Sequence, residues 1–195
     1  MIRLYHSPMT RSGSILWLLE ELGVPYETKT VGFRRVDGTG EKDAANPHPH
    51  GKVPALKDGD DFLFESSAIA LYLTDKYREV SMGPAVGDPK RAEYLSWLAY
   101  RPGVMEPALI SRRLGHQHVN GMMGWAVADE VEEVLNAHMT GKKYFLGDDF
   151  TALDILIGGG IHFMIQAKMM AETPVMQAYT ARIVERPAFV KMMAA

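Results

Sequence analysis

Short apolar runs dominate the first part of the chain, whereas apolar residues recur at helical spacing in the remainder. In the first part the pattern predicts, in order, a strand at 2–6, a helix at 11–22, a strand at 26–31, a short helix near 41–45, strands at 55–57 and 62–64, and a helix at 66–77. The Asp58-Gly59 pair between the last two strands is typical of a tight hairpin turn. The sequence therefore predicts a βαβαββα domain over residues 1–77.

From residue 78 onward the chain carries one irregular stretch and then a series of helical patterns. Residues 78–88 lack periodicity and contain Gly, Pro and Ser, which predicts a linker. Asp88 and Pro89 are typical of a helix start, and Thr173 and Pro174 repeat this signal near the carboxyl end. We therefore expect an all-helical domain over residues 89–195.

Two local motifs in the expected helical domain indicate structural roles. Thr151 and Asp154 have the spacing of a capping box, in which side chains satisfy backbone N–H groups at a helix start. Gly158, Gly159 and Gly160 stand inside a helical pattern, although each glycine costs about 1 kcal/mol relative to alanine. The triplet predicts either a close backbone approach or a distorted helix.

The composition is that of an ordinary folded protein with one large core or two small ones. Of the 195 residues, 47% are hydrophobic and 23% are charged, and the net charge of -3 comes from interspersed signs. This pattern gives no basic surface for nucleic acid. The absence of cysteine excludes a disulfide, a protein thiolate and a zinc–thiolate site. Because no signal peptide or membrane-spanning apolar run is present, we expect a cytoplasmic protein with no membrane partner.

A Val-Pro step stands directly before the first strand of the predicted hairpin. Pro54 has no N–H to donate, so it suits the entrance of a strand and not a central ladder position. We expect the Val53–Pro54 bond to be cis, which turns the N–H and C=O of Val53 outward. An extended peptide ligand pairs with such a main-chain edge in the way that an added strand does.

Glu65 and Ser66 join the second hairpin strand to the helix that follows. Ser66 is expected to cap this helix, whose first N–H groups and dipole stabilise a carboxylate. The neighbouring Glu65 carboxylate suits an ammonium group. Taken singly, the two residues are more simply explained as a helix cap and a solvated charge. In combination with Val53-Pro54 they predict a site for the amino-acid end of a small anionic peptide.

These motifs resemble the glutathione-binding signature of the soluble glutathione transferases. The resemblance is carried by Asn46-Pro47, Gly51-Lys52-Val53-Pro54-Ala55-Leu56 and Glu65-Ser66-Ser67, and it extends to residues 4–8, 18–27, 150–155 and 185–189. It implies a thioredoxin-like first domain, an all-helical second domain and a homodimer. It also implies that glutathione is the co-substrate and is bound by Lys52, Val53, Pro54, Glu65 and Ser66.

The resemblance places the chemistry at the start of the first helix, where a hydroxyl in this family holds the glutathione sulfur as a thiolate. Ser7, Thr10 and Ser12 supply hydroxyls at this turn. An alignment without gaps puts Met9 where many classes of the family carry serine. We favour Thr10 as the activating residue and Ser12 as the second candidate, although Thr10 equally suits a simple helix cap.

The implied reaction is attack of the glutathione thiolate on a small hydrophobic electrophile. We expect Met9, Tyr100 and Met105 to face the electrophile, because they fall near the cleft between the two predicted domains. Two alternatives remain open. One is reduction of disulfides or peroxides by glutathione, and the other is a non-catalytic binding or assembly module that keeps the fold.

Two H-x-H pairs raise the question of a metal site. His48 and His50 lie in a loop that is two residues longer than the family spacing, and His116 and His118 form the second pair. No cluster of carboxylates or cysteines completes a tetrahedral ligand set, so solvated loop histidines are the simpler interpretation. We assign no metal.

Overall fold

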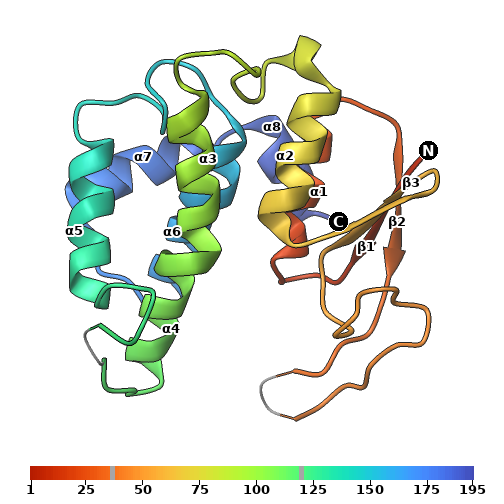
Figure 1. Ribbon diagram of the computed structural model, residues 1–195, viewed down its shortest axis with the longest axis horizontal. Coiled ribbons are helices and arrows are strands. Elements are labelled where there is room, and N and C mark those ends of the chain that lie inside the picture. The colour runs from red at the N-terminus through yellow and green to blue at the C-terminus, as the bar shows by residue number, and fades with distance from the viewer. Residues whose placement is uncertain (36–37, 119–120) are drawn as a thin grey trace. The chain divides into compact units, whose positions relative to one another are not determined.

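The computed structural model describes residues 1–35, 38–118 and 121–195, which form two compact units (Figure 1). The first unit comprises residues 1–80 together with 186–195, and the second comprises residues 81–185. The end of the chain thus folds with the first unit, whereas the sequence pattern placed it in the helical part. The expected fold class, a thioredoxin-like sheet domain followed by an all-helical region, is confirmed.

The first unit is built on a four-stranded sheet in the order β2-β1-β3-β4. Its strands are β1 (Ile2–His6), β2 (Tyr26–Thr30), β3 (Ala55–Asp58) and β4 (Asp61–Phe64). β1 runs parallel to β2 and antiparallel to β3, and β3 and β4 form the predicted hairpin. Gly59 makes the tight turn between them possible, since its φ of 64° is unfavourable for other residues.

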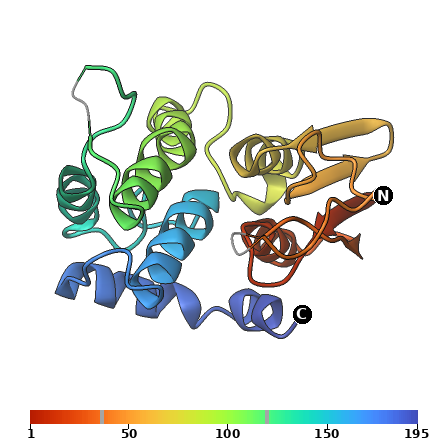
Figure 2. The ribbon, with the colours of Figure 1, turned by 90° about the horizontal axis from the view of Figure 1, so that it is seen from below.

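Three helices complete the first unit: α1 (Ser12–Leu22), α2 (Ser66–Lys76) and α8 (Pro187–Met193). Figures 1 and 2 show α1 and α2 side by side on one face of the sheet, and α1 also packs against α8. The buried Trp17 ring meets the Phe189 ring edge to face, with centroids 4.9 Å apart. A single 3-10 turn, Arg78–Val80, follows α2.

The short helix predicted near residues 41–45 does not form, and the expectation is wrong. The Asp43 carboxylate instead accepts hydrogen bonds from the N–H of Gly32 at 3.1 Å and the N–H of Ala45 at 2.8 Å. Such side-chain bonds give the backbone an alternative to a helical turn.

The expected cap of α2 is also wrong by one residue. Ser66 is the first helical residue, and Glu65 occupies the cap position without a side-chain cap bond. Glu65 leaves β4 in a left-handed conformation, with φ of 71°, and its carbonyl accepts the N–H of Ile69 at 3.0 Å. This sharp turn brings the chain directly from the strand into the helix.

The second unit is built from helices. They are α3 (Arg91–Tyr100), α4 (Glu106–Arg113), α5 (Ala128–Met139), α6 (Gly159–Gln166) and α7 (Pro174–Val184), with π-helical stretches at Arg101–Met105 and Asp154–Gly158. The Thr173 hydroxyl accepts the N–H of Met176 at 3.2 Å, which confirms the predicted cap of α7. Within the described residues, no helix is both long enough and apolar enough to cross a membrane.

The first helix of this unit starts later than expected. The Asp88 carboxylate accepts the N–H of Lys90 at 2.7 Å in a turn that precedes α3, so the helix begins at Arg91 and not at Pro89. Asp88 therefore stabilises a separate turn that precedes α3, and it does not cap the helix itself.

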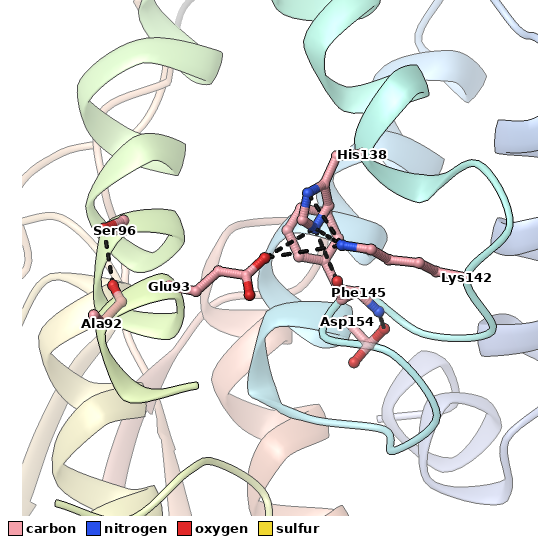
Figure 3. Close-up of polar contacts among 7 residues, drawn as sticks. All are labelled: Ala92, Glu93, Ser96, His138, Lys142, Phe145 and Asp154. Atoms are coloured by element: carbon pink, nitrogen blue, oxygen red, sulfur yellow. Dashed lines mark hydrogen bonds and ion pairs between the residues drawn. The ribbon is translucent and has the colours of Figure 1, made fainter. Parts of the chain in front are cut away.

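Asp154 is the polar centre of the second unit. Its side chain is completely buried and accepts hydrogen bonds from the N–H of Phe145 and the N–H of Thr151, both at 2.7 Å. The hydroxyls of Thr151 and Tyr179 add bonds at 3.1 Å and 2.5 Å. The Phe145 carbonyl accepts from His138 Nε2 at 2.9 Å, which links the motif to α5 (Figure 3). The structural role predicted for the Thr151-Asp154 motif is confirmed.

The glycine triplet shows both features that the sequence left as alternatives, a distorted helix and a close approach to the backbone. Gly158 ends a π-helical stretch, and a Cβ atom at this position would lie 2.8 Å from Ile183 Cδ1 and 2.8 Å from Tyr179 Cε1. Helix distortion and close approach of α7 therefore occur together at Gly158.

Candidate functional site

Strand pairing brings the predicted binding residues to one end of the sheet. Tyr5 of β1 pairs with Ala55 of β3, and Ala55 pairs with Phe64 of β4. Beyond this row lie the turn that follows β1, the Val53–Pro54 step and Glu65. Because paired strands share a register, these three segments are neighbours in the first unit.

The Val53–Pro54 peptide bond is cis, as expected. The half-buried Val53 side chain packs against the small core cluster formed by Tyr5, Val31 and Ala55. Lys52, immediately before it, is exposed. Side-chain packing therefore fixes the position of Val53 at this end of the sheet.

A buried polar network holds the loop that precedes Val53. Asn46 donates from Nδ2 to the Lys52 carbonyl at 3.0 Å and accepts the N–H of His48 at 3.0 Å. His48 Nδ1 accepts the N–H of His50 at 3.1 Å. The His48 ring is only 4% exposed, and burial lowers its pKa. The expectation that both loop histidines are solvated is therefore wrong for His48 and holds for the exposed His50.

The three candidate hydroxyls lie in the turn between β1 and α1 and differ in exposure. Ser12 is completely buried and Ser7 is buried, whereas Thr10 is half-buried and the most accessible of the three. Thr10 Oγ1 lies 2.7 Å from the Ser7 carbonyl oxygen and 2.7 Å from Ser12 Oγ. The neighbouring Met9 is 75% exposed and has a left-handed φ of 57°, which tightens the turn.

His6 belongs to the same turn, although the sequence pattern did not single it out. Its ring is 6% exposed, and its Nδ1 lies 2.8 Å from Ser12 Oγ. Burial lowers the pKa of His6, so the ring is neutral at pH 7. The available signal was the alternation along β1, which puts His6 on the same buried face as Ile2 and Leu4.

A cavity of about 310 Å³ lies beside this turn. Its lining comprises Ser7, Gly32, Phe33, Arg35, Thr39 and Gly40. Its volume is close to the lower limit of about 300 Å³ for small-molecule sites. Apart from Ser7, sequence reasoning missed this lining, because it comes from a polar loop without a recognisable motif.

The residues expected to face an electrophile are distributed over both units. Met9 belongs to the first unit, and Tyr100 and Met105 belong to the second. Tyr100 is half-buried, with its ring 4.9 Å from the Trp97 ring, whereas Met105 is completely buried next to Gly160. Met105 is thus a core residue of the helical unit in this structure.

The end of the sheet in the first unit suits an anionic, extended ligand. It combines a helix start at Ser66, an exposed carboxylate at Glu65 and the half-buried Thr10. Over residues 1–35, 38–118 and 121–195, no group of three His, Cys, Asp or Glu side chains could hold a metal ion.

Comparisons with known proteins agree with this geometry. A family model described as "Glutathione S-transferase, N-terminal domain" matches residues 1–75. Glutathione S-transferase 3 of Schizosaccharomyces pombe is 31% identical over 173 residues, which cover 79% of this chain and 70% of that protein. Glutathione S-transferase PARB of Nicotiana tabacum is 28% identical, with 97% of this chain and 96% of that protein covered. A sphingomonad glutathione S-transferase solved in complex with glutathione has a TM-score of 0.77 at 25% identity, and the match covers 98% of this chain and 97% of that one.

Proposed function

Because this chain belongs to the glutathione transferase family, we propose that it joins the glutathione sulfur to a small hydrophobic electrophile. The observation that supports this most directly is the register of β1, β3 and β4, which gathers the Thr10 turn, Val53 and Glu65 at one end of the sheet. The sphingomonad relative, which shares the fold, was solved with glutathione.

In the proposed complex, glutathione lies extended along the main chain of Val53. Its γ-glutamyl carboxylate meets the first N–H groups of α2 at Ser66, where the helix dipole stabilises a negative charge. Its ammonium group pairs with the exposed Glu65 carboxylate, and the exposed Lys52 supplies a positive charge beside Val53. The cis Pro54 stands next to this edge.

Thr10 is the proposed activating residue, and its hydroxyl donates a hydrogen bond to the glutathione sulfur. A free thiol has a pKa of roughly 8.5, so lowering the pKa by two units requires about 2.7 kcal/mol. A charge-assisted hydrogen bond contributes about 1.5–3 kcal/mol and a helix N-terminus about 0.3–1 kcal/mol. Ser12 is the weaker candidate, because its side chain is completely buried.

The remaining parts of the proposal concern the electrophile site, the domain limits, the cellular location and the oligomeric state. The electrophile is proposed to bind near Met9 of the first unit, and the 75% exposure of Met9 supports this placement. Residues 1–77 are proposed as the glutathione-binding domain, 78–88 as a linker and 89–195 as the helical domain, although the last ten residues of that range, 186–195, fold with the first unit. Family membership supports a cytoplasmic homodimer that acts in detoxification.

Titration calorimetry with glutathione, followed by a panel of electrophiles, disulfides and peroxides, tests the proposal. We expect binding in the micromolar to millimolar range and turnover with a chloronitrobenzene. Glu65→Gln should weaken binding, whereas Asp60→Asn in the exposed hairpin turn serves as the control. Turnover confined to disulfides or peroxides would indicate a reductase, binding without turnover would indicate a binding module, and absence of binding would contradict the proposal.

A further inference from the structure

A continuous series of short hydrogen bonds links His6 to Thr10 inside the turn that follows β1. His6 Nδ1 lies 2.8 Å from Ser12 Oγ, and Ser12 Oγ lies 2.7 Å from Thr10 Oγ1. Thr10 Oγ1 in turn lies 2.7 Å from the Ser7 carbonyl oxygen. Because His6 and Ser12 are buried, water does not compete for these bonds. The chemistry of each group then decides which atom donates.

The assignment of protons begins at Thr10. A carbonyl oxygen accepts and never donates, so the 2.7 Å contact with Ser7 requires the Thr10 hydroxyl to donate its single proton there. In the equally short contact with Ser12, the Ser12 hydroxyl must therefore donate and Thr10 must accept. The N–H of Ser12, at 3.3 Å, donates to the second lone pair of Thr10 Oγ1.

The same reasoning fixes the proton on His6. The Ser12 hydroxyl has two acceptors within reach, Thr10 Oγ1 at 2.7 Å and the Ser7 carbonyl at 3.2 Å, and the shorter contact takes its proton. One lone pair of Ser12 Oγ accepts the N–H of Ser7 at 3.2 Å. The 2.8 Å contact with His6 is then a bond in which Nδ1–H donates to the remaining lone pair of Ser12. The neutral His6 ring therefore carries its proton on Nδ1.

We propose that His6 is a positioning residue, whose Nδ1–H orients Ser12 and thereby makes the Thr10 hydroxyl an obligate hydrogen-bond donor to the glutathione sulfur. The inference rests on the proposed function, because it concerns the sulfur-activating step. With both lone pairs of Thr10 occupied, the hydroxyl presents its proton to a ligand, and this proton turns from the Ser7 carbonyl to the sulfur. The arrangement favours the thiolate, and the thiol proton passes to water.

Without the Nδ1–H of His6, the donor and acceptor in the hydrogen bond between Ser12 and Thr10 could exchange roles. Ser12 would regain a free lone pair, so the Thr10 proton could turn inward to Ser12 and away from the ligand. The pKa of the bound glutathione thiol is then expected to rise by about one unit, which is a tenfold change in the thiolate-to-thiol ratio. Binding of S-methylglutathione, which has no thiol proton, should be unaffected.

His6→Phe and His6→Asn form the matched pair for the test. The phenyl ring fills the space without a donor, whereas the asparagine amide can donate near the place of Nδ1. Thiolate absorbance of bound glutathione is measured against pH for each variant, together with the affinity for S-methylglutathione. We expect the pKa of bound glutathione to rise in His6→Phe and to be restored in His6→Asn. His138→Phe, which removes a half-buried histidine from the second unit, is the control.

A measurement on the unmodified protein covers the case in which His6→Phe fails to fold. Two-bond ¹⁵N–¹H correlation of the histidine rings, with His6 assigned by comparison with His6→Asn, reports which ring nitrogen is protonated. Protonation at Nδ1 supports the proposal, and the Nε2–H tautomer overturns it. An unchanged thiol pKa in His6→Phe, with S-methylglutathione still bound, also overturns it. If the unmodified protein does not bind S-methylglutathione, the proposed function itself fails.

Discussion

Thr10 is the side chain on which the proposed chemistry depends most. Thr10→Val keeps the shape of the side chain and removes its hydroxyl, which costs one charge-assisted hydrogen bond to the sulfur. At about 1.5–3 kcal/mol for that bond, kcat/KM for a generic electrophile should fall about 10- to 100-fold, and the pKa of the bound thiol should rise. Ser7→Ala keeps the Ser7 carbonyl and is the matched control. Unaltered thiolate absorbance in Thr10→Val would remove this hydroxyl from the mechanism.

Single residues were predictable where their conformation depends on local chemistry. The cis bond before Pro54 and the Thr173 cap follow from the residue types and their immediate neighbours. His6 and His48 were not predicted, because their roles depend on which polar atoms become buried once the chain has folded around them. Alternation along β1 indicates the buried face for His6, but the hydrogen-bond partners of His6 and His48 cannot be read from the sequence alone.

Asp154 should dominate the stability of the region where α5, α7 and the Asp154–Gly158 stretch meet. Asp154→Ala leaves the buried N–H groups of Phe145 and Thr151 and the Tyr179 hydroxyl without their acceptor. Each unsatisfied group costs about 1–3 kcal/mol, so the free energy of unfolding should fall by at least about 3 kcal/mol. Chemical denaturation measures this loss. Asp148→Ala, at an exposed position nearby, should change the stability little, and equal effects of the two variants would refute the assignment.

The contact between the hairpin and α2 should be sensitive to acid. The Asp58 carboxylate accepts hydrogen bonds from Lys76 and, at 3.1 Å, from Tyr72, and the bond from Lys76 lowers the pKa of Asp58. A carboxyl whose pKa is lower in the folded state than in the unfolded state stabilises the fold above its unfolded pKa of about 3.9. This contribution is lost as the pH falls below that value towards the folded pKa.

Asp58→Asn tests this linkage. Because Lys76 is 39% exposed, screening by solvent limits the contribution at pH 7 to about 0.5–1 kcal/mol. The stability difference between the two proteins should shrink as the pH is lowered from 5 to 3. Denaturation curves across this range check it, and a difference that stays constant with pH would contradict the role of the carboxylate.

Element types were more predictable than their ends. Alternation and helical periodicity correctly located every strand of the sheet and the helices at 11–22 and 66–77, because these patterns reflect burial on one face. The helix near 41–45 failed because Asp43 binds backbone N–H groups of the loop, and α3 began late because Asp88 stabilises a separate turn. Side-chain bonds to the backbone compete with helix formation at such sites and leave little trace in the periodicity.

At the scale of the whole molecule, Arg186 joins the end of the chain to the first unit across 165 positions of sequence. Its guanidinium donates to both oxygens of Glu21, at 2.6 Å and 2.7 Å. Arg186→Ala should lower the free energy of unfolding by about 1–3 kcal/mol and make residues 186–195 accessible to protease. Lys191→Ala is the control, since its ion pair with Glu20 involves a lysine that is 70% exposed. Equal losses in the two variants would contradict a specific role for Arg186.

Periodicity alone does not reveal which of the two compact units each helix belongs to. The sequence pattern assigned everything after residue 88 to a helical domain, and helical character is indeed what the pattern measures. The assignment of α8 to the first unit depends on contacts with α1, such as the meeting of Trp17 and Phe189. Contacts between segments so distant in sequence are decided by tertiary packing.

A crystal structure of the protein grown with saturating glutathione would test the central claim most directly. The account predicts the tripeptide at the end of the sheet, paired with the main chain of Val53. Its glutamyl carboxylate should lie at the start of α2, and its sulfur should lie within hydrogen-bond distance of Thr10 Oγ1. A vacant sheet end at saturating glutathione, or a tripeptide bound in another part of the molecule, would contradict the account.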